Sequence, residues 1–322
     1  MQHSRYRVNA ATDGSAGLRR SDRVGGVRSP ATLTVLGIEV DRVRLGLWSE
    51  RLAPDPQPFF LPEDDALGRD VGKNEALSAD LRDTYCGWRI DRSLAARWVT
   101  EERFMALPRA DRVRLVRSQV DCRRGAVPTV RRWADLLDPV VLRAQADGHR
   151  FVWWPSLLRH HEAEILGRLV DKDRLPSQHE RIDAATWAGC AAVVPRARAL
   201  GGTFPPGSGP NCFGTVMGGC GVEGAEDTWM QIEPFAAWLA ASTRPATRAA
   251  DGDPGTVFVW SDHGGVPAHA AVGIGAGWAL KKPSQEWSSP RTIVRVADMV
   301  RANRTPDWRL QRHAMIAGRS GS

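Results

Sequence analysis

Cys212 and His269 are the residues whose types and surroundings could support nucleophilic chemistry. Cys212 stands in GPNCFGTVM, directly after a Gly-Pro turn and before an apolar stretch that predicts a helix capped by Asn211. In the first turn of a helix, exposed N–H groups and the helix dipole favour the thiolate, which is the nucleophilic form. His269 opens the apolar run HAAVGIG after a Gly-rich turn, so an imidazole there could take the thiol proton.

Both residues also have a purely structural interpretation. A lone cysteine is more often a small buried apolar side chain, and a histidine in an apolar strand is more often a hydrogen-bonded core residue. His263, in the turn SDHGGVPA, is a weaker candidate for the base because turn side chains are usually solvated.

Metal and nucleotide motifs are not predicted. The number of cysteines is five, which is odd, and no CxxC occurs, so neither a disulfide framework nor a structural zinc site is expected. His160 and Glu164 lie four residues apart and are interpreted as a helix-surface pair. The glycines of VGIGAGW do not open a helix, which excludes a dinucleotide-binding fingerprint. We therefore expect no cofactor.

The elements that must position these residues follow in order along the C-terminal part. A helix is predicted over 232–242, after the Gly- and Pro-rich stretch 201–221 that contains Cys212. Apolar runs rich in β-branched residues then predict successive strands of an antiparallel sheet, over 256–260, 269–275, 277–281, 291–296 and 309–316.

These motifs resemble the NlpC/P60 cysteine peptidases, a family with a circularly permuted papain-like fold. PNCFGTV is similar to the family's nucleophile element, PGTVFVW to the strand before the histidine, and HAAVGIGAGWAL to the strand that the histidine heads. The resemblance begins at Gly201. It implies that Cys212 is the nucleophile and His269 the general base.

One position departs from the family's pattern. The family places a third polar residue, which orients the imidazole, twelve residues after the base, and that count reaches Lys281. An ammonium group has no acceptor for an imidazole N–H, and its charge disfavours protonation of the histidine. Ser284, Gln285 and Glu286 are the alternatives for the orienting role. Gln285 is slightly preferred, although all three could equally be ordinary loop residues.

Three further residues are expected to contact substrate. Asn211 could donate a hydrogen bond to a developing oxyanion beside the backbone N–H of Cys212. Trp278 and Trp287 flank the expected site and could shape a substrate groove. These two tryptophans are nevertheless interpreted first as core residues, as are Trp153, Trp154, Trp229, Trp238 and Trp260.

The sequence thus predicts an α+β protein in three parts. Residues 1–30 are expected to be a disordered tail, 31–197 an α-rich domain of unknown role, and 198–322 the papain-like domain with its antiparallel sheet. In the N-terminal part, helices are expected over 93–107, 111–120, 128–137 and 156–170, and strands over 32–40, 43–48 and 151–155. The Pro-rich stretch 54–70 is expected to be a loop.

Charge and hydropathy give few clues to partners. The net charge is +7, but only four of the 44 basic residues are Lys, and the Arg residues are spread among acids. With no nucleic-acid-binding motif, we expect no nucleic-acid partner. No apolar run reaches the roughly 18–20 residues that span a bilayer, and the N-terminus lacks an apolar secretory segment. A cytoplasmic protein with no membrane partner is therefore expected; no oligomeric state is predicted.

The function predicted from these residues is that of a thiol hydrolase or acyltransferase. Cys212 would attack the carbonyl of a peptide, other amide or ester, His269 would shuttle the proton, and a thioester would then be resolved. The alternative, motivated by Lys281, is a catalytically inactive papain-like binding module.

Overall fold

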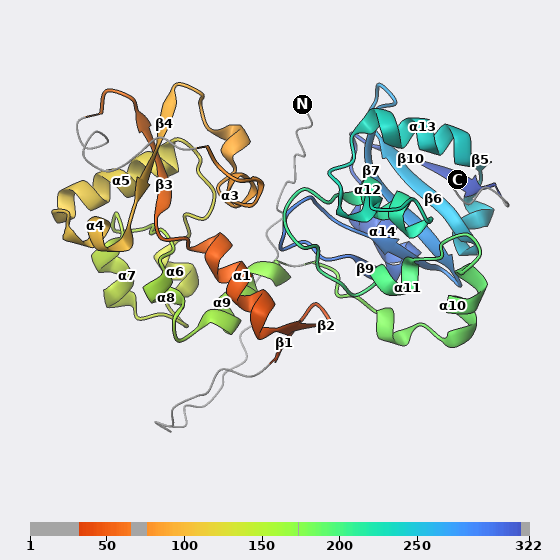
Figure 1. Ribbon diagram of the computed structural model, residues 1–322, viewed down its shortest axis with the longest axis horizontal. Helices are drawn as coiled ribbons and strands as arrows, with labels where there is room; N and C mark the ends of the chain where they lie inside the picture. Colours follow the sequence, from red (N-terminus) through yellow and green to blue (C-terminus); the bar gives the residue numbers. More distant parts are fainter. Residues whose placement is uncertain (1–31, 66–75, 173, 317–322) are drawn as a thin grey trace.

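The computed structural model describes residues 32–65, 76–172 and 174–316, and the chain forms two lobes that lie side by side (Figure 1). Helices and antiparallel sheets occur together, so the protein is of the α+β class. The tail expected over 1–30 lies outside the described residues. In these residues, no helix is both long and apolar enough to cross a membrane.

The N-terminal lobe consists of short helices and two small antiparallel sheets. One sheet is the hairpin β1 (Thr32–Val35) and β2 (Ile38–Asp41), and the other pairs β3 (Gln57–Pro62) with β4 (Leu94–Val99). The helices are α1 (Arg42–Leu52), α3 (Ala79–Thr84), α4 (Glu101–Ala106), α5 (Arg109–Asp121), α6 (Val130–Trp133), α7 (Pro139–Gln145), α8 (Pro155–Leu158) and α9 (Glu162–Asp171), with the short 3-10 helix η1 (Gly87–Arg89).

Aromatic side chains fill the core of this lobe. Trp153 and Trp154 are almost fully buried, as expected, and so is Trp133. The same expectation is wrong for Trp229 of the C-terminal lobe, which is 44% exposed. Two aromatic residues from much later in the chain complete the same apolar cluster: Phe204 and Trp287. Their rings lie 4.7 and 5.7 Å from that of Trp48, measured between ring centroids. The core of the N-terminal lobe therefore includes side chains from the second half of the sequence.

The C-terminal lobe is built on a six-stranded antiparallel sheet. Its strand order is β5-β10-β6-β7-β8-β9. The strands are β5 (Thr243–Ala246), β6 (Pro254–Ser261), β7 (Pro267–Gly275), β8 (Trp278–Lys281), β9 (Thr292–Arg295) and β10 (Arg309–Met315). The helices are α10 (Ala184–Cys190), α11 (Ala197–Leu200), α12 (Cys212–Gly219), α13 (Ile232–Ser242) and α14 (Val296–Ala302), with 3-10 helices η2 (His179–Arg181), η3 (Ala225–Asp227) and η4 (Arg248–Gly252).

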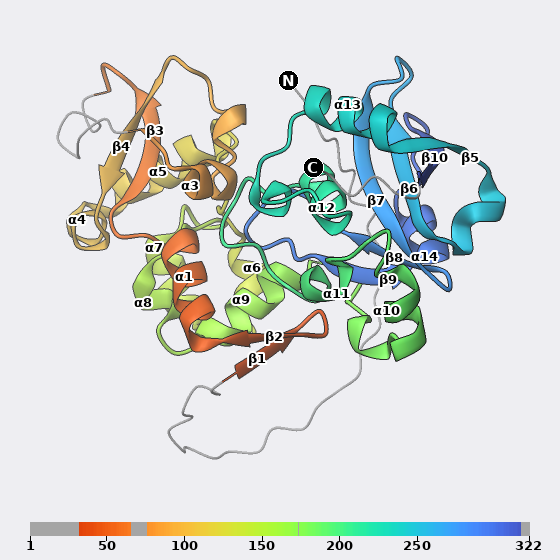
Figure 2. The same cartoon turned by 45° about the vertical axis from the view of Figure 1, so that its right-hand side comes forward.

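The two faces of this sheet have separate apolar clusters. Ala270, Val272 and Ile274 of β7 pack with α10, α12 and α13, and we call this side the α12 face. Figures 1 and 2 both show α12 next to β7. The intervening side chains of the strands pack with Val296 and Met299 of α14 on the opposite side, which we call the α14 face. The alternation follows from the two-residue period of a strand.

The elements expected in the C-terminal lobe are confirmed. α12 begins at Cys212, α13 covers the expected range, and each apolar run forms a strand. The apolar core of this lobe begins earlier than expected, because Ile182, Cys190, Val194 and Ala197 belong to its α12-face cluster. The expected boundary between 197 and 198 thus falls inside the core of the C-terminal lobe.

Four expectations for the N-terminal lobe are wrong. Residues 94–99 form β4 rather than a helix because they pair with β3, which itself lies in the stretch expected to be a loop. Residues 43–48 belong to α1, whose start is capped by the Asp41 side chain accepting from the N–H of Arg44. Residues 151–154 form no regular element.

Candidate functional site

Cys212 is the first residue of α12, as the sequence predicts. The Asn211 side chain caps the helix by accepting a hydrogen bond from the N–H of Gly214 at 3.0 Å. α12 is apolar and every one of its residues is buried, so the helix runs through the lobe rather than along its surface. The Cys212 side chain is therefore covered, and the residue is only 8% exposed.

His269 does not lie beside Cys212. It is directly opposite Trp260 on β6, and their rings contact each other with centroids 5.4 Å apart. Trp260 belongs to the α14-face cluster, whereas Cys212 belongs to the α12-face cluster. The imidazole and the thiol are thus on opposite faces of the sheet, and the expected nucleophile–base pair is not assembled.

The electrostatic surroundings keep both groups neutral near pH 7. Burial, together with the charge of Lys281, lowers the pKa of His269 to about 3. Burial raises the pKa of Cys212 to about 11 and outweighs the backbone N–H groups of Ala270 and Phe213 and the charge of Lys282, which favour the thiolate. The expectation that Lys281 disfavours protonation of His269 is confirmed.

The neighbours of Cys212 on its own face are Ala270 and Lys282. Ala270 follows His269 directly, and a shift of one residue along a strand changes the face. Lys282 is fully buried, and its Nζ donates to the carbonyl oxygens of Ser284 and Glu286 at 2.5 and 3.2 Å. Burial lowers the pKa of Lys282 well below its ordinary value, as do the charges of Arg291 and Arg174, while Cys212 and Glu286 oppose this shift.

The Asn211 side chain forms hydrogen bonds with two backbone groups. Its Oδ1 caps α12 and its Nδ2 donates to the carbonyl oxygen of Met230 at 2.7 Å. Both ends of the amide are engaged, so its orientation is fixed by two backbone groups. The residue type that caps the helix was predicted correctly, but its second bond could not be read from the sequence.

Gln285 does not orient His269 by any contact within the described part of the chain. It lies in the loop after β8, and its backbone carbonyl oxygen accepts a hydrogen bond from the N–H of Gly209 at 2.9 Å. Glu286, the alternative, instead forms an ion pair with Arg174, whose Nη2 is 3.0 Å from Oε2 of Glu286. Gln285 and Glu286, the two candidates for the third residue of the expected triad, instead connect loops through these contacts.

The two tryptophans expected to shape a groove are packed instead. Trp278 is 6% exposed and lies under the Arg295 guanidinium, whose central carbon is 3.5 Å from the centre of the indole ring. Trp287 lies between the lobes, where its Nε1 donates to Oγ1 of Thr84 at 2.9 Å. Neither indole presents an open face beside Cys212.

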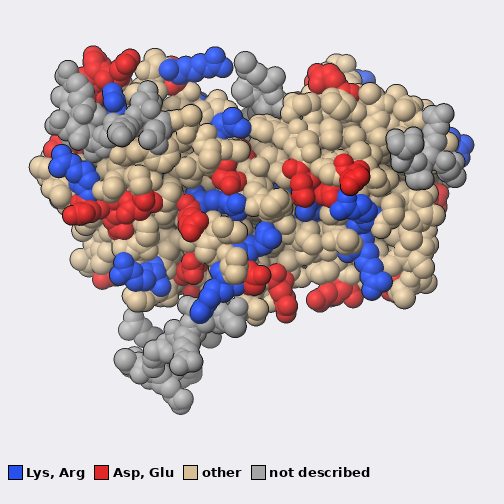
Figure 3. Space-filling view, in the orientation of Figure 1, with Lys and Arg blue, Asp and Glu red and all other residues tan. Residues whose placement is uncertain are grey.

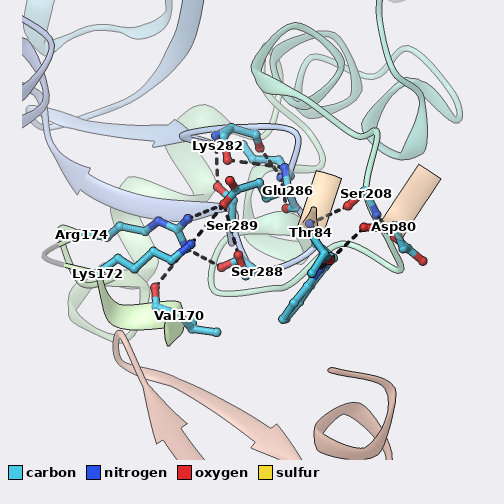
Figure 4. Close-up of polar contacts among 12 residues, drawn as sticks. Asp80, Thr84, Val170, Lys172, Arg174, Ser208, Lys282, Glu286, Ser288 and Ser289 are labelled. Carbon is cyan, nitrogen blue, oxygen red and sulfur yellow. Dashed lines mark hydrogen bonds and ion pairs between the residues drawn. The ribbon is translucent and has the colours of Figure 1, made fainter. Parts of the chain in front are cut away.

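A polar cluster between the lobes covers the loops that lead to Cys212 (Figure 4). Asp80 of α3 accepts from Nε of Arg51 at 2.9 Å and from the N–H of Ser208 at 2.5 Å. The Ser208 hydroxyl in turn accepts from the N–H of Trp287 at 3.1 Å. The N-terminal lobe is thus hydrogen-bonded to the segment immediately before Cys212.

Asp83 is the buried carboxyl group of this cluster. It is 5% exposed, and burial and the nearby Glu286 raise its pKa to about 6 against the opposing hydrogen bond from Ser208. On the far side, Arg174 donates to Glu286 and to the carbonyl oxygen of Ser288 at 2.6 Å. Asp83 has no motif around it in the sequence, because the groups that surround it come from distant loops.

Charged groups of both signs are interspersed over the face of the two lobes seen in Figure 3. This agrees with the even distribution of Arg and acidic residues along the chain. In the described residues, no group of three or more His, Cys, Asp or Glu side chains is suited to hold a metal ion.

No family model, curated protein or solved structure matches this chain.

Proposed function

We propose that the C-terminal lobe is a binding module on a papain-like scaffold in which the catalytic pair is not formed. The observation that carries this proposal is the placement of Cys212 and His269 on opposite faces of the sheet. A thiol needs a base within hydrogen-bond reach to become a nucleophile at neutral pH. Here the residue of β7 on the thiol's side is Ala270, which has no side-chain base.

The order of the elements supports the scaffold part of the proposal. A cysteine at the start of a buried helix is followed by an antiparallel sheet against which that helix packs, as the family resemblance implies. The raised pKa of Cys212 supports the non-catalytic part. With a pKa of about 11, fewer than about one thiol in a thousand is ionised at pH 7.5.

Alkylation of the native protein tests the proposal. The rate of iodoacetamide labelling at pH 7.5 is measured for each cysteine by peptide mass spectrometry. We expect Cys212 to react no faster than the half-buried Cys86 and Cys122, with Cys190 as the buried reference. Protein unfolded in urea, in which all five react alike, is the control. Labelling of Cys212 more than about tenfold faster than Cys86 would overturn the proposal.

A second candidate is the thiol hydrolase or acyltransferase with Lys282 as the base. It is favoured by the electrostatic interaction between Cys212 and Lys282 on the same face, and by the lowered pKa of Lys282. The neutral amine would take the thiol proton, the thiolate would add to a carbonyl, and the resulting ammonium would protonate the leaving group. Water would then hydrolyse the thioester.

The second candidate has a test of its own. 4-Nitrophenyl acetate, a generic acyl donor, should release nitrophenol in a burst, and intact-mass analysis should find one acetyl group on Cys212. Cys212→Ala and Lys282→Met should abolish the burst, while Cys190→Ala should retain it. A protein that carries no acetyl group on Cys212 under these conditions excludes this candidate.

A further inference from the structure

A cavity of about 990 Å³ opens on the α14 face of the C-terminal lobe. Its walls come from β6, β10, η4, α14 and the segment that follows α14. This volume is at the upper end of the range of small-molecule sites in proteins. The cavity is separated from Cys212 by the sheet, because the Trp260 side chain in its lining belongs to the α14-face cluster.

The apolar part of the lining is aromatic. Trp260 is 2% exposed, and Leu310, directly opposite on β10, lies beside it with the half-buried Trp308. Flat indole surfaces accommodate a planar ring, since an aromatic ligand can stack on them or contact their edges. The apolar residues therefore favour a ligand with a planar, weakly polar part.

The polar part of the lining is cationic. Arg312 and Asp251 neutralise each other through two hydrogen bonds, from Nε at 2.5 Å and from Nη2 at 3.0 Å. Arg248 and Arg304 also line the cavity, and within the described part of the chain no ion pair involves either of them. Asp298, the other acid of the lining, lies 3.5 Å from Arg301. Arg295, which also lines the cavity, has no ion pair in the described residues either; it lies over the Trp278 ring and donates to the carbonyl oxygen of Ala276. Three guanidinium groups of the lining thus lack an acidic partner, and the exposed Arg248 and Arg304 suit a phosphate.

One buried amide in the lining lacks a partner. Asn303 is 6% exposed, and its Nδ2 is buried without a hydrogen bond. An amide donor that is buried and unsatisfied costs free energy, so such groups call for an acceptor.

We propose that this cavity binds a nucleoside phosphate, with the base against Trp308 and Leu310 and the phosphate at Arg248 and Arg304. The inference rests on the binding role proposed for the lobe and names the ligand class of that role. The site lies on the face of the sheet opposite Cys212, which is the face that also holds His269.

Titration calorimetry on the full chain at constant ionic strength tests this inference with ADP, adenosine and pyrophosphate. ADP should bind at least about tenfold more tightly than adenosine, which lacks the phosphates, or pyrophosphate, which lacks the base. Equal affinity for pyrophosphate and ADP would mean an anion site only. No heat of binding with ADP at about 1 mM would overturn the inference.

Matched variants locate the site. Arg304→Gln and Arg248→Gln should each weaken ADP binding by roughly fivefold to tenfold, and Trp308→Leu should reduce the preference for ADP over pyrophosphate. Arg117→Gln, at an exposed arginine on α5, is the control and should leave the affinity unchanged. ADP binding that none of the three cavity variants alters would assign the ligand to another site.

The alkylation rate of Cys212, measured on the same preparation, separates the two proposals. ADP binding with a slow Cys212 supports both. ADP binding with a fast Cys212 overturns the non-catalytic assignment alone. No ADP binding with a slow Cys212 overturns the nucleotide inference alone.

Discussion

The two faces of the six-stranded sheet are built from the same strands but are covered differently. The α12 face is sealed by several helices, and the thiol that sequence reasoning singles out lies inside that packing. The α14 face has one seven-residue helix in its apolar cluster and contains the cavity with the unpaired arginines. The cavity therefore lies on the face opposite Cys212, which is also the face of His269.

The same comparison explains why a good catalytic motif does not make a catalytic pair. A cysteine at a helix start is a local property, and the structure retains it. The alignment of a base with that cysteine depends on which face of β7 each residue takes, and His269 and Ala270 take opposite faces.

The largest effect is expected when a core side chain on the α12 face is truncated. Phe213 is 1% exposed and stacks on Phe235, with ring centroids 4.3 Å apart. Phe213→Ala should lower the free energy of unfolding by about 3–5 kcal/mol, measured by urea denaturation. The matched change Trp308→Ala, at the half-buried rim of the α14-face cavity, should cost less than half as much. Equal losses would remove the contrast between a sealed and an open face.

Acid should destabilise the protein through His269. Its pKa is about 3 in the folded state and 6.5 ordinarily, so the unfolded chain binds the proton first as the pH falls. The contribution of His269 to stability is complete above pH 6.5 and is lost progressively toward pH 3. Urea midpoints at pH 7 and pH 4.5 should therefore differ less in His269→Phe than in the parent protein. His263→Gln, in an exposed turn, is the control with an unchanged difference.

Removing the double role of Asn211 should cost about 1–2 kcal/mol in the free energy of unfolding. Asn211→Ala deletes both the cap on α12 and the bond to the carbonyl oxygen of Met230. Asn211→Ser retains a capping oxygen without a charge and loses only the donor, so it should be less destabilised. If the Ala and Ser variants are equally destabilised in denaturation, the side-chain cap contributes nothing to stability.

The smallest effect is expected at the contact between the lobes. The pKa of Asp83 is raised from 3.8 to about 6, so the buried carboxylate reduces stability as the pH rises through this range, and fully above pH 6. Asp83→Asn should raise the melting temperature at pH 7 and change it little at pH 4. Asp80→Asn, one turn away on the same helix, should lower it because the Asp80 carboxylate pairs with Arg51. A decrease in both variants at pH 7 would contradict the assignment for Asp83.

Sequence patterns predicted the C-terminal lobe better than the N-terminal lobe for a physical reason. β6 and β7 are buried on both faces, so they read as continuous apolar runs that only a central strand explains. In contrast, residues 94–99 have partly exposed side chains, and their strand conformation is imposed by pairing with β3. Local propensity contains no information about that partner.

The site was predictable only in its local features. The helix start at Cys212 follows from the residues around it, and the unfavourable charge of Lys281 on His269 follows from the twelve-residue spacing in the family that the sequence resembles. The face of His269 depends on the register of β6 and β7, which shifts between Trp260 and Ser261, and the sequence does not specify that shift. The cavity and the Asp83 cluster combine side chains from distant segments, so no motif marks either of them.

Phe204 and Trp287 couple the folding of the two lobes, because they belong to the C-terminal half of the sequence and pack in the core of the N-terminal lobe. Both rings are buried in an apolar core whose other members all precede residue 171. A fragment that ended between the lobes would leave two aromatic-sized holes around Trp48, and its partner fragment would display two bare rings to water. Heating should accordingly melt both halves in one calorimetric transition, and efforts to dissect this protein by truncation would yield neither half intact.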